Sequence, residues 1–259
     1  MMENPKELFH VAGKKAIVTG GARGLGYSMA EGLHKAGVEV VLIATNEERL
    51  KQAAKKLGNE GAKVSYVAGD LSNLEGIEKI YQNALNQLGG RLDILVNNAG
   101  IQYRCEAEHF PIDKWKSIID INLNAVFVLS QLAGKTMLRQ GGGKIINIAS
   151  MTSFFGSEMI SAYSASKGGV MQLTKALSNE WAQRGINVNA IAPGYMETKL
   201  TSDMKAKNPA QYEEITRRIP AHRWGRAEDL QGTVIFLSSD ASNYISGAII
   251  PVDGGYLGK

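Results

Sequence analysis

The sequence predicts a single doubly wound α/β domain with a mainly parallel sheet of seven strands. Short runs rich in β-branched residues alternate with longer segments of helical spacing along all 259 residues. Most of these runs are apolar almost throughout, which is typical of parallel strands covered on both faces. No linker rich in proline and serine divides the chain, so one domain over residues 1–259 is expected. The expected strands are Ala16–Thr19, Val38–Ile43, Val64–Val67, Ile94–Val96, Lys144–Ile148, Asn187–Ile191 and Ala248–Val252.

Most segments between the expected strands have sequence patterns typical of helices, and one segment does not. Leu25, Met29 and Leu33 recur every four residues, which predicts a helix with one buried face. After the third strand, Ser72–Glu75 has the pattern of a capping box and predicts the start of another helix. The stretch Tyr195–Trp224 breaks the alternation, since it is polar and contains two prolines. It predicts a mobile flap over a site at the carboxyl ends of the strands.

The composition excludes several classes of protein. The net charge is +4 without any run of five basic residues, so no nucleic-acid partner is expected. No stretch approaches ~18 apolar residues, and residues 1–14 lack the apolar run of a signal peptide, so no membrane association is expected. The single cysteine, Cys105, suits a reducing compartment and hence a cytoplasmic location. The four histidines show no metal-ligand spacing, so no metal is expected.

The segment Thr19–Gly26 reads Thr-Gly-Gly-Ala-Arg-Gly-Leu-Gly and joins the first expected strand to the first expected helix. Glycines adopt backbone angles that other residues resist, and they let main-chain N–H groups approach a pyrophosphate at the positive end of a helix. A glycine-rich turn without a ligand is the alternative, which the position of this turn disfavours. The pattern Thr-Gly-x-x-x-Gly-x-Gly in this place resembles the short-chain dehydrogenase/reductase family.

The resemblance implies a Rossmann-type fold and a nicotinamide dinucleotide cofactor. The residues after the second strand, Ala44, Thr45 and Asn46, include no carboxylate that would bind the ribose hydroxyls and repel a 2′-phosphate. Arg23 in the glycine turn can pair with a 2′-phosphate, unless it is a solvated loop cation. We therefore expect NADP, with NAD as the open alternative.

The resemblance also implies further contacts with the dinucleotide. Asp70 would contact the adenine, although an aspartate here is also typical of a turn or a helix start. Asn97–Gly100 would stabilise the sheet and line the cofactor, and Thr198 would bind the nicotinamide carboxamide. The expected cofactor contacts are Gly20, Arg23, Gly24, Leu25, Gly26, Thr45, Asp70, Leu71, Asn97, Ala99, Gly100, Tyr163, Lys167, Pro193, Gly194, Met196 and Thr198.

A proton-transfer group is predicted in the second half of the chain. Tyr163 and Lys167 lie four residues apart in a stretch compatible with a helix, so they share one face. An ammonium near a phenol favours the phenolate and lowers its pKa from about 10, which suits acid–base work. Ser150 follows the fifth expected strand, where its hydroxyl can bond a substrate oxygen as charge develops. The resemblance adds Asn122, which would orient Lys167 through a water, with Asn124 as the weaker candidate.

Arg104 and three later segments of the sequence bear on the substrate. Arg104 follows the fourth strand at the mouth of the expected site, where its guanidinium suits a carboxylate unless it is a rim arginine. Arg218–Gly225, Asn189–Gly194 and Val252–Leu257 resemble the branch of the family that acts on sugar acids, such as gluconate 5-dehydrogenases and 2-dehydro-3-deoxy-gluconate dehydrogenases. The expected substrate contacts are Arg104, Ser150 and Tyr163.

These observations predict an oxidoreductase that transfers a hydride between a nicotinamide and a secondary alcohol or ketone of a sugar acid. A 3-oxoacyl-carrier-protein reductase shares nearly all the motifs and is the alternative enzyme, although no compact basic cluster marks a carrier-protein surface. A dinucleotide-sensing or scaffold protein that has lost catalysis is a third possibility, against which the intact Ser150, Tyr163 and Lys167 argue. The resemblance further implies a homotetramer.

Overall fold

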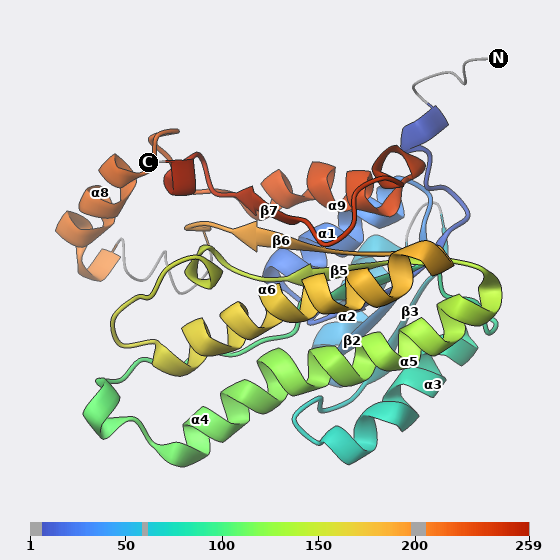
Figure 1. The fold of residues 1–259 in the computed structure, drawn as a ribbon, viewed down its shortest axis with the longest axis horizontal. Coiled ribbons are helices and arrows are strands. Elements are labelled where there is room, and N and C mark those ends of the chain that lie inside the picture. The colour runs from blue at the N-terminus through green and yellow to red at the C-terminus, as the bar shows by residue number, and fades with distance from the viewer. Residues whose placement is uncertain (1–6, 59–61, 198–205, 259) are drawn as a thin grey trace.

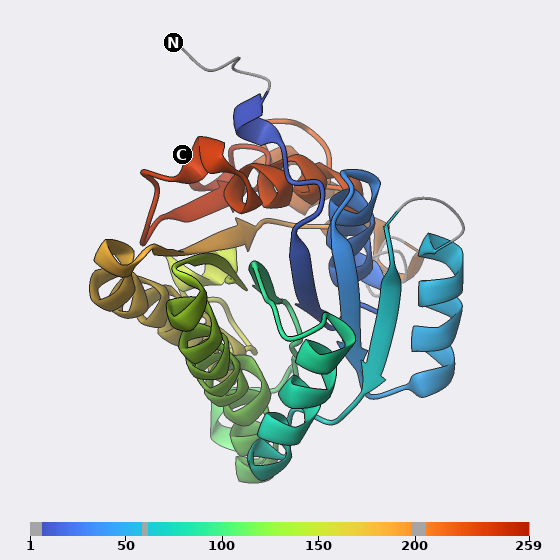
Figure 2. The same cartoon turned by 90° about the vertical axis from the view of Figure 1, so that its right-hand side faces the viewer.

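The computed structural model describes residues 7–58, 62–197 and 206–258. Seven strands form one parallel sheet in the order β3-β2-β1-β4-β5-β6-β7, covered by helices on both faces (Figure 1 and Figure 2). The doubly wound fold is confirmed, and every expected strand lies within two residues of its predicted bounds. The strands are β1 (Lys15–Thr19), β2 (Glu39–Ala44), β3 (Val64–Ala68), β4 (Ile94–Asn97), β5 (Gly143–Ile148), β6 (Ile186–Pro193) and β7 (Ile249–Val252).

The helices that surround the sheet are α1 (Gly24–Lys35), α2 (Glu47–Leu57), α3 (Ile77–Gln87), α4 (Ile112–Ile119), α5 (Ala125–Gln140), α6 (Ser161–Trp181), α8 (Pro209–Arg218) and α9 (Gln231–Ser238). Val18 in β1 lies in the core under α1, α2 and α9, whereas its neighbour Ile17 lies in the core under α3, α5 and α6. Both side chains are fully buried, which explains why the strands are apolar at consecutive positions. The predicted buried face of α1 is confirmed at Met29 and Leu33, while Leu25 is only half-buried.

The strand order places one crevice at the centre of the sheet. The chain moves outward from β1 through β2 to β3, and it then returns to the other side of β1 to form β4. The carboxyl ends of β1 and β4 flank the point where the winding reverses, and doubly wound sheets bind their ligands there. The glycine turn after β1 and the segment 98–101 after β4 therefore lie next to each other at this edge.

One long helical rod crosses the α3–α5–α6 face. A π-helical turn at Asp120–Asn124 joins α4 to α5, so the helical hydrogen-bonding runs over Ile112–Gln140. In the described part of the chain, this rod is long and apolar enough to cross a membrane by length and composition alone. Half of its apolar window is buried within the fold. The rod contains no continuous apolar run, because polar residues such as Asp120, Asn122 and Asn124 lie within it.

The predicted capping box at Ser72–Glu75 is wrong. The Ser72 hydroxyl and N–H both donate to the Asp70 Oδ1 atom, at 2.8 and 2.9 Å. The short 3-10 turn Leu74–Gly76 begins after Asn73 with no side-chain cap, and α3 follows it. Asp70 lies only two residues before Ser72, and its carboxylate is a strong acceptor, so the serine closes a turn with Asp70 and does not cap the helix.

The predicted flap contains α8, which Asn208 caps by accepting a backbone N–H bond. Trp224, near the end of the flap, is only 2% exposed and stacks on Tyr212 of α8 with 4.7 Å between ring centroids. The aromatic stack anchors α8 next to the C-terminal segment. Residues 198–205 of the flap lie outside the described residues, and its mobility stays a prediction.

A buried lysine stands at the opposite end of the sheet from the crevice. The Lys144 ammonium in β5 donates to three neutral oxygens, Asn243 Oδ1 (2.7 Å), Asn187 Oδ1 (2.8 Å) and Ser242 Oγ (3.3 Å), and the residue is 7% exposed. Burial, reinforced by the positive charge of Lys14, lowers the pKa of Lys144 to about 8. The native state therefore releases a proton that the unfolded chain still holds up to a pH near 10.5.

This difference predicts that Lys144 makes the stability of the protein pH-dependent. Between about pH 8 and 10.5 the unfolded state binds more protons at this position, so stability should rise with pH in that window. The free energy of unfolding of wild type minus that of Lys144→Met, measured by urea denaturation at several pH values, should shift in favour of wild type as the pH rises. A difference that stays flat from pH 7 to 10.5 would contradict this assignment.

Candidate active site

The glycine turn is tied to the end of β4 by one threonine and one asparagine. The Thr19 Oγ1 atom accepts bonds from the N–H groups of Asn98 and Ala99, each at 3.0 Å. The Asn98 side chain donates to the Thr19 carbonyl at 3.0 Å. Sequence reasoning did not single out Asn98 as a separate residue, although it lies inside the Asn-Asn-Ala-Gly motif. These bonds fix the geometry of the crevice before any ligand is bound.

Two positions of the turn require glycine for steric reasons. Gly20 has φ of +65°, and a Cβ there would lie 2.7 Å from Asn98 Nδ2. At Gly26 a Cβ would collide with the same amide and would lie 2.5 Å from the Gly20 carbonyl oxygen. At Gly24, the first residue of α1, a Cβ would instead meet no atom of the described residues within 4 Å. The turn thus packs tightly against β4 on one side and leaves the helix N-terminus accessible on the other, as a phosphate group requires.

Several cations lie beside the N-terminus of α1. Arg23 precedes α1, is exposed and makes no side-chain capping bond. It lines a hollow of about 250 Å³ together with Arg49 and Lys56 of α2. Thr45 follows β2 and is exposed, and no carboxylate stands at this strand end. This arrangement favours an anionic group next to the adenosine ribose position.

The predicted adenine contacts remain predictions. Asp70 is exposed and its Oδ1 atom holds Ser72, so it forms a turn whatever else it contacts. Leu71 is only 6% exposed and belongs to the core under α3, which leaves its backbone as the part able to face a ligand.

The side chain of Asn97 points into the sheet and away from the crevice. Its amide donates to Ser130 Oγ (3.0 Å) and Asn147 Oδ1 (2.9 Å), and Asn147 in turn donates to Thr174 Oγ1 (3.0 Å). These polar groups form a ladder between β4, β5 and helices α5 and α6. A cofactor contact at this position is left to the Asn97 backbone, whereas Ala99 is half-buried and Gly100 is exposed at the crevice.

The predicted proton-transfer residues meet at the carboxyl end of β5. Ser150 precedes the 3-10 turn Met151–Ser153 that follows β5, and Tyr163 and Lys167 lie one turn apart on α6. The Lys167 Nζ atom lies 5.8 Å from the centre of the Tyr163 ring and donates to the Ile148 carbonyl at 2.5 Å. The Ser150 side chain acts on the Tyr163 phenol and lowers its pKa.

Burial is the main cause of the shifted pKa values of Tyr163 and Lys167. Burial raises the pKa of Tyr163, and the bond from Ser150 partly opposes that rise. Full burial lowers the pKa of Lys167 to about 8. In the protein without a ligand, desolvation therefore outweighs the expected effect of the ammonium on the phenol, and Tyr163 is held protonated. A protonated phenol is ready to donate to a ketone oxygen, and ionising it calls for an added positive charge nearby.

Asn122 acts on the loop after β4. Its Oδ1 atom accepts the Ile101 N–H at 2.9 Å, while its amide donates to the Ile101 carbonyl (3.0 Å) and to Ser166 Oγ (3.1 Å). The residue is fully buried in the π-helical turn. Asn124 instead bonds Asp120 at 2.8 Å. Orientation of Lys167 through a water stays a prediction, and the described bonds show that Asn122 fastens this loop to α6.

One cavity of about 500 Å³ contains the reacting groups and the expected substrate cation. Its described lining is Leu25, Gln102, Arg104, Ile148, Ala149, Ser150, Met151, Thr152, Ser157, Ile160, Tyr163, Pro193, Gly194, Tyr195, Met196, Lys207 and Trp224. Arg104 is exposed at its mouth, and its positive charge acts on the Tyr195 hydroxyl. Thr198 lies outside the described residues. The cavity therefore joins Ser150 and Tyr163 with Arg104 and with the predicted cofactor contacts Leu25, Pro193, Gly194 and Met196, whereas Lys167 and Asn122 do not line it.

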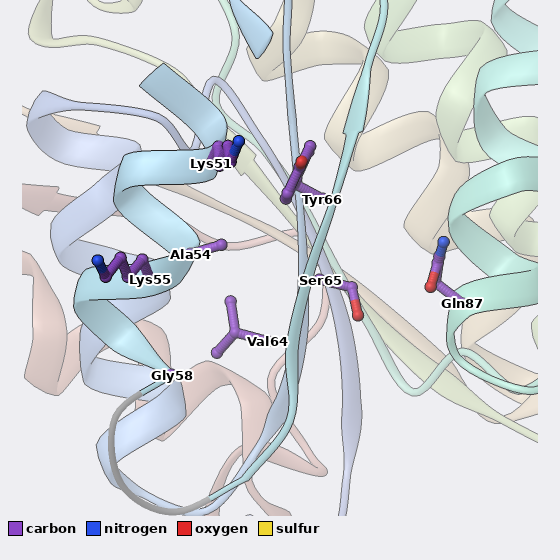
Figure 3. Close-up of a pocket in the computed structure, with 8 residues that line it drawn as sticks. All are labelled: Lys51, Ala54, Lys55, Gly58, Val64, Ser65, Tyr66 and Gln87. Atoms are coloured by element: carbon purple, nitrogen blue, oxygen red, sulfur yellow. The ribbon is translucent and has the colours of Figure 1, made fainter. Parts of the chain in front are cut away.

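A wider hollow lies elsewhere, beside the edge strand β3. Figure 3 shows its lining, to which Lys51 and Lys55 of α2 and Tyr66 of β3 contribute, and its volume is about 680 Å³. Among the described residues that border it, none belongs to the proton-transfer group or to the glycine turn. We therefore assign the chemistry to the smaller cavity.

Comparison with known proteins agrees with this geometry. The sequence model of a family described as short chain dehydrogenase matches residues 14–209. The chain belongs to the short-chain dehydrogenase family. It is 43% identical to a 2-dehydro-3-deoxy-D-gluconate 5-dehydrogenase of Bacillus subtilis and 39% identical to a gluconate 5-dehydrogenase of Gluconobacter oxydans, with 98% of this chain and of each relative covered. The crystal structure of a gluconate 5-dehydrogenase from Burkholderia cenocepacia in complex with NADP and tartrate is 36% identical, with a TM-score of 0.93 over 99% of this chain and 100% of that one.

The crevice of this short-chain dehydrogenase fits a dinucleotide on its own geometry. The N–H groups at the start of α1 are accessible, the space around Gly24 is open, and cations border the expected ribose end. From there the crevice leads to the cavity with Tyr163, because Leu25 at the start of α1 also lines that cavity. A cofactor bound along this path would bring its reactive ring to the proton-transfer group.

Proposed function

We propose that this protein is an NADP-dependent dehydrogenase of a sugar acid, which interconverts a secondary alcohol and a ketone. The observation that supports this most is that Ser150, Tyr163 and Arg104 line one cavity that continues into the dinucleotide crevice. Lys167 lies beside Tyr163 on α6, with its Nζ atom 5.8 Å from the ring centre. Relatives of about 40% identity over nearly the whole chain carry the names of sugar-acid dehydrogenases. The carrier-protein reductase is supported less, because a solved reductase of that kind is only 27% identical to this chain. The intact Ser150, Tyr163 and Lys167 argue against an inactive sensor.

The residues of the chain move the proton and hold the substrate. The cofactor, when bound, supplies or accepts the hydride. In reduction, Tyr163 donates its proton to the carbonyl oxygen while Ser150 donates a hydrogen bond to the same atom. In oxidation, Tyr163 takes the proton from the substrate hydroxyl. Lys167, four residues along α6, stabilises the phenolate when its ammonium is charged.

The choice of NADP is supported by the groups beside the glycine turn. Arg23 is exposed and its guanidinium can bind two oxygens of a 2′-phosphate, while Thr45 offers a hydroxyl at the end of β2. An acidic residue at the end of β2 would favour NAD, but this position is occupied by Ala44. NAD remains the second cofactor to be assayed.

We expect Arg104 to hold the carboxylate of the substrate. Replacing it in Arg104→Ala should raise the KM for a sugar acid by about tenfold or more, because a charge-assisted bond is lost. The KM for a neutral polyol of the same length should change little. Steady-state kinetics on both substrates measure the contrast, and an equal change for both would remove the assignment.

The function itself is tested by a substrate panel. Gluconate, 5-keto-gluconate, 2-dehydro-3-deoxy-gluconate and a 3-oxoacyl thioester are assayed with NADP(H) and with NAD(H) by absorbance at the nicotinamide band. The proposal expects turnover of at least one sugar acid with NADP(H) in preference to NAD(H). Turnover of the thioester alone, or of no compound although NADPH binds, would reject it in favour of the reductase or of the sensor.

We further propose that the protein is a homotetramer in the cytoplasm. Ile112 on α4 is 67% exposed, Phe127 on α5 is 43% exposed, and Tyr244 near β7 is fully exposed. Large exposed apolar side chains suit contacts with other copies of the chain. The oligomeric state follows from light scattering of the purified protein.

A further inference from the structure

The residues around Ser150 impose a direction on its hydroxyl. A serine oxygen has two lone pairs and one hydrogen, so it can accept two bonds and donate one. The Thr152 N–H donates to Ser150 Oγ at 3.1 Å, and the Thr152 hydroxyl donates to the same atom at 3.0 Å. Both lone pairs are then occupied, and the Ser150 hydrogen is the part that remains to be used.

The short turn that carries these groups is itself fixed to α6. The Ser153 hydroxyl accepts the Ser150 N–H at 3.3 Å and donates to the Lys167 carbonyl at 2.7 Å. Ser150, Thr152 and Ser153 are each less than a tenth exposed. Since Tyr163 lies on the same helix as Lys167, the serine hydroxyl and the phenol are held in a constant relative position.

We propose that Thr152 is a positioning residue which, by donating to Ser150, commits the Ser150 hydroxyl to donate towards Tyr163 and the reacting oxygen of the substrate. Thr152 borders the cavity but acts through Ser150. The bonds then form a chain in which each hydroxyl donates to the next, and such chains strengthen each member. Without the Thr152 hydroxyl, one Ser150 lone pair is free and its hydrogen can rotate to another acceptor.

The electrostatics of Tyr163 agree with the direction that this geometry gives. The bond with Ser150 lowers the pKa of Tyr163, against the larger effect of burial. A hydrogen bond lowers the pKa of an acid when it is donated to the charged form. Because Ser150 Oγ already accepts two bonds from Thr152, the proposal makes the Ser150 hydroxyl the donor and the phenol oxygen the acceptor. The inference rests on the function proposed above only in taking Tyr163 as the group that moves the proton.

The test is a titration of Tyr163 in the full chain with NADP added. Protein labelled with ¹³C at the tyrosine Cζ atoms gives one signal per tyrosine, and the signal lost in Tyr163→Phe identifies Tyr163. In Thr152→Val, which keeps the backbone N–H and the shape of the side chain, the titration of Tyr163 should move upward by about half a pH unit or more. Thr152→Ser, which restores the hydroxyl, should titrate like wild type.

Two further variants separate this effect from packing. Thr152→Ala removes the same hydroxyl with a smaller side chain and should shift Tyr163 in the same direction. Thr136→Val removes another buried threonine hydroxyl, one that bonds Tyr81 at 2.9 Å, and should leave Tyr163 unmoved. Tyr163 curves that superimpose for wild type, Thr152→Val and Thr152→Ala would overturn the proposal.

Kinetics provide the second readout. The pH at which kcat/KM for alcohol oxidation reaches half its plateau should rise in Thr152→Val, with kcat lowered about fivefold to tenfold. KM and the Kd for NADPH should change little, since Thr152 is assigned to neither. If wild type oxidises no sugar acid but the Tyr163 titrations still differ, the sugar-acid function fails and the positioning role stands.

Discussion

Tyr163→Phe is expected to lower kcat by about a thousandfold while leaving NADPH binding almost unchanged. The substitution removes one oxygen and keeps the ring in its buried place on α6. Ser150 cannot replace the phenol, because a serine hydroxyl is a far weaker acid and does not ionise in the pH range where a tyrosine can. Stopped-flow and steady-state assays measure the loss, and a fluorescence titration with NADPH checks that the dinucleotide crevice is intact.

The pH dependence of the same variant is a sharper test. Burial raises the pKa of Tyr163, so the phenol is protonated at neutral pH and alcohol oxidation in wild type should accelerate as the pH rises and the phenolate forms. The variant should lack this rise. Turnover within tenfold of wild type, with the same pH profile, would mean that another group moves the proton.

Gly26→Ala is expected to have the second largest effect, through the shape of the crevice. The added Cβ would collide with the Asn98 amide and would lie 2.5 Å from the Gly20 carbonyl oxygen. Both neighbours belong to the bonded junction of β1 and β4, so they cannot yield without moving the glycine turn. We expect the Kd for NADP to rise at least tenfold and the free energy of unfolding to fall by about 1–3 kcal/mol.

Gly232→Ala provides the matched control. This glycine lies in α9, and a Cβ there would meet nothing within 4 Å among the residues that the structure describes. The change should leave NADP binding unaltered and stabilise the helix by about 0.5–1 kcal/mol. Calorimetric titration with NADP and thermal unfolding of both variants give the comparison. A Gly26→Ala protein that binds NADP as tightly as Gly232→Ala would show that the turn can shift without cost.

The strands, and the closeness of Tyr163 to Lys167, were predictable because their signals are local. A strand covered on both faces needs a continuous apolar run, and the spacing of Tyr163 and Lys167 puts them on one side of any helix. Ser150 was proposed from its place just after a strand, and Arg104 from its place in the loop that follows the fourth strand. Each of these predictions depended on a few adjacent residues and on the common edge of a parallel sheet.

The remaining features depend on contacts that the sequence does not state. Ser72 had the local sequence pattern of a helix cap, but its hydroxyl donates a hydrogen bond to the Asp70 carboxylate instead. Asn97 and Asn98 are neighbours with the same type of side chain, but they have different surroundings. The Asn97 side chain points into the core and bonds Asn147, whereas the Asn98 side chain bonds Thr19 at the crevice. Thr152 gains its importance only from its distance to Ser150 in the folded turn.

The π-helical turn at Asp120–Asn124 has a consequence for how this chain can change in length. A π turn contains one residue more than an α-helical turn, so losing a single codon there would leave a continuous α-helix. Everything before the deletion would then swing by about 100° around the helix axis. Asn122 would lose its register with Ile101, and the loop beside the catalytic cavity would be released. A single-codon deletion at this point would therefore damage the enzyme even though every residue that touches a ligand is still encoded.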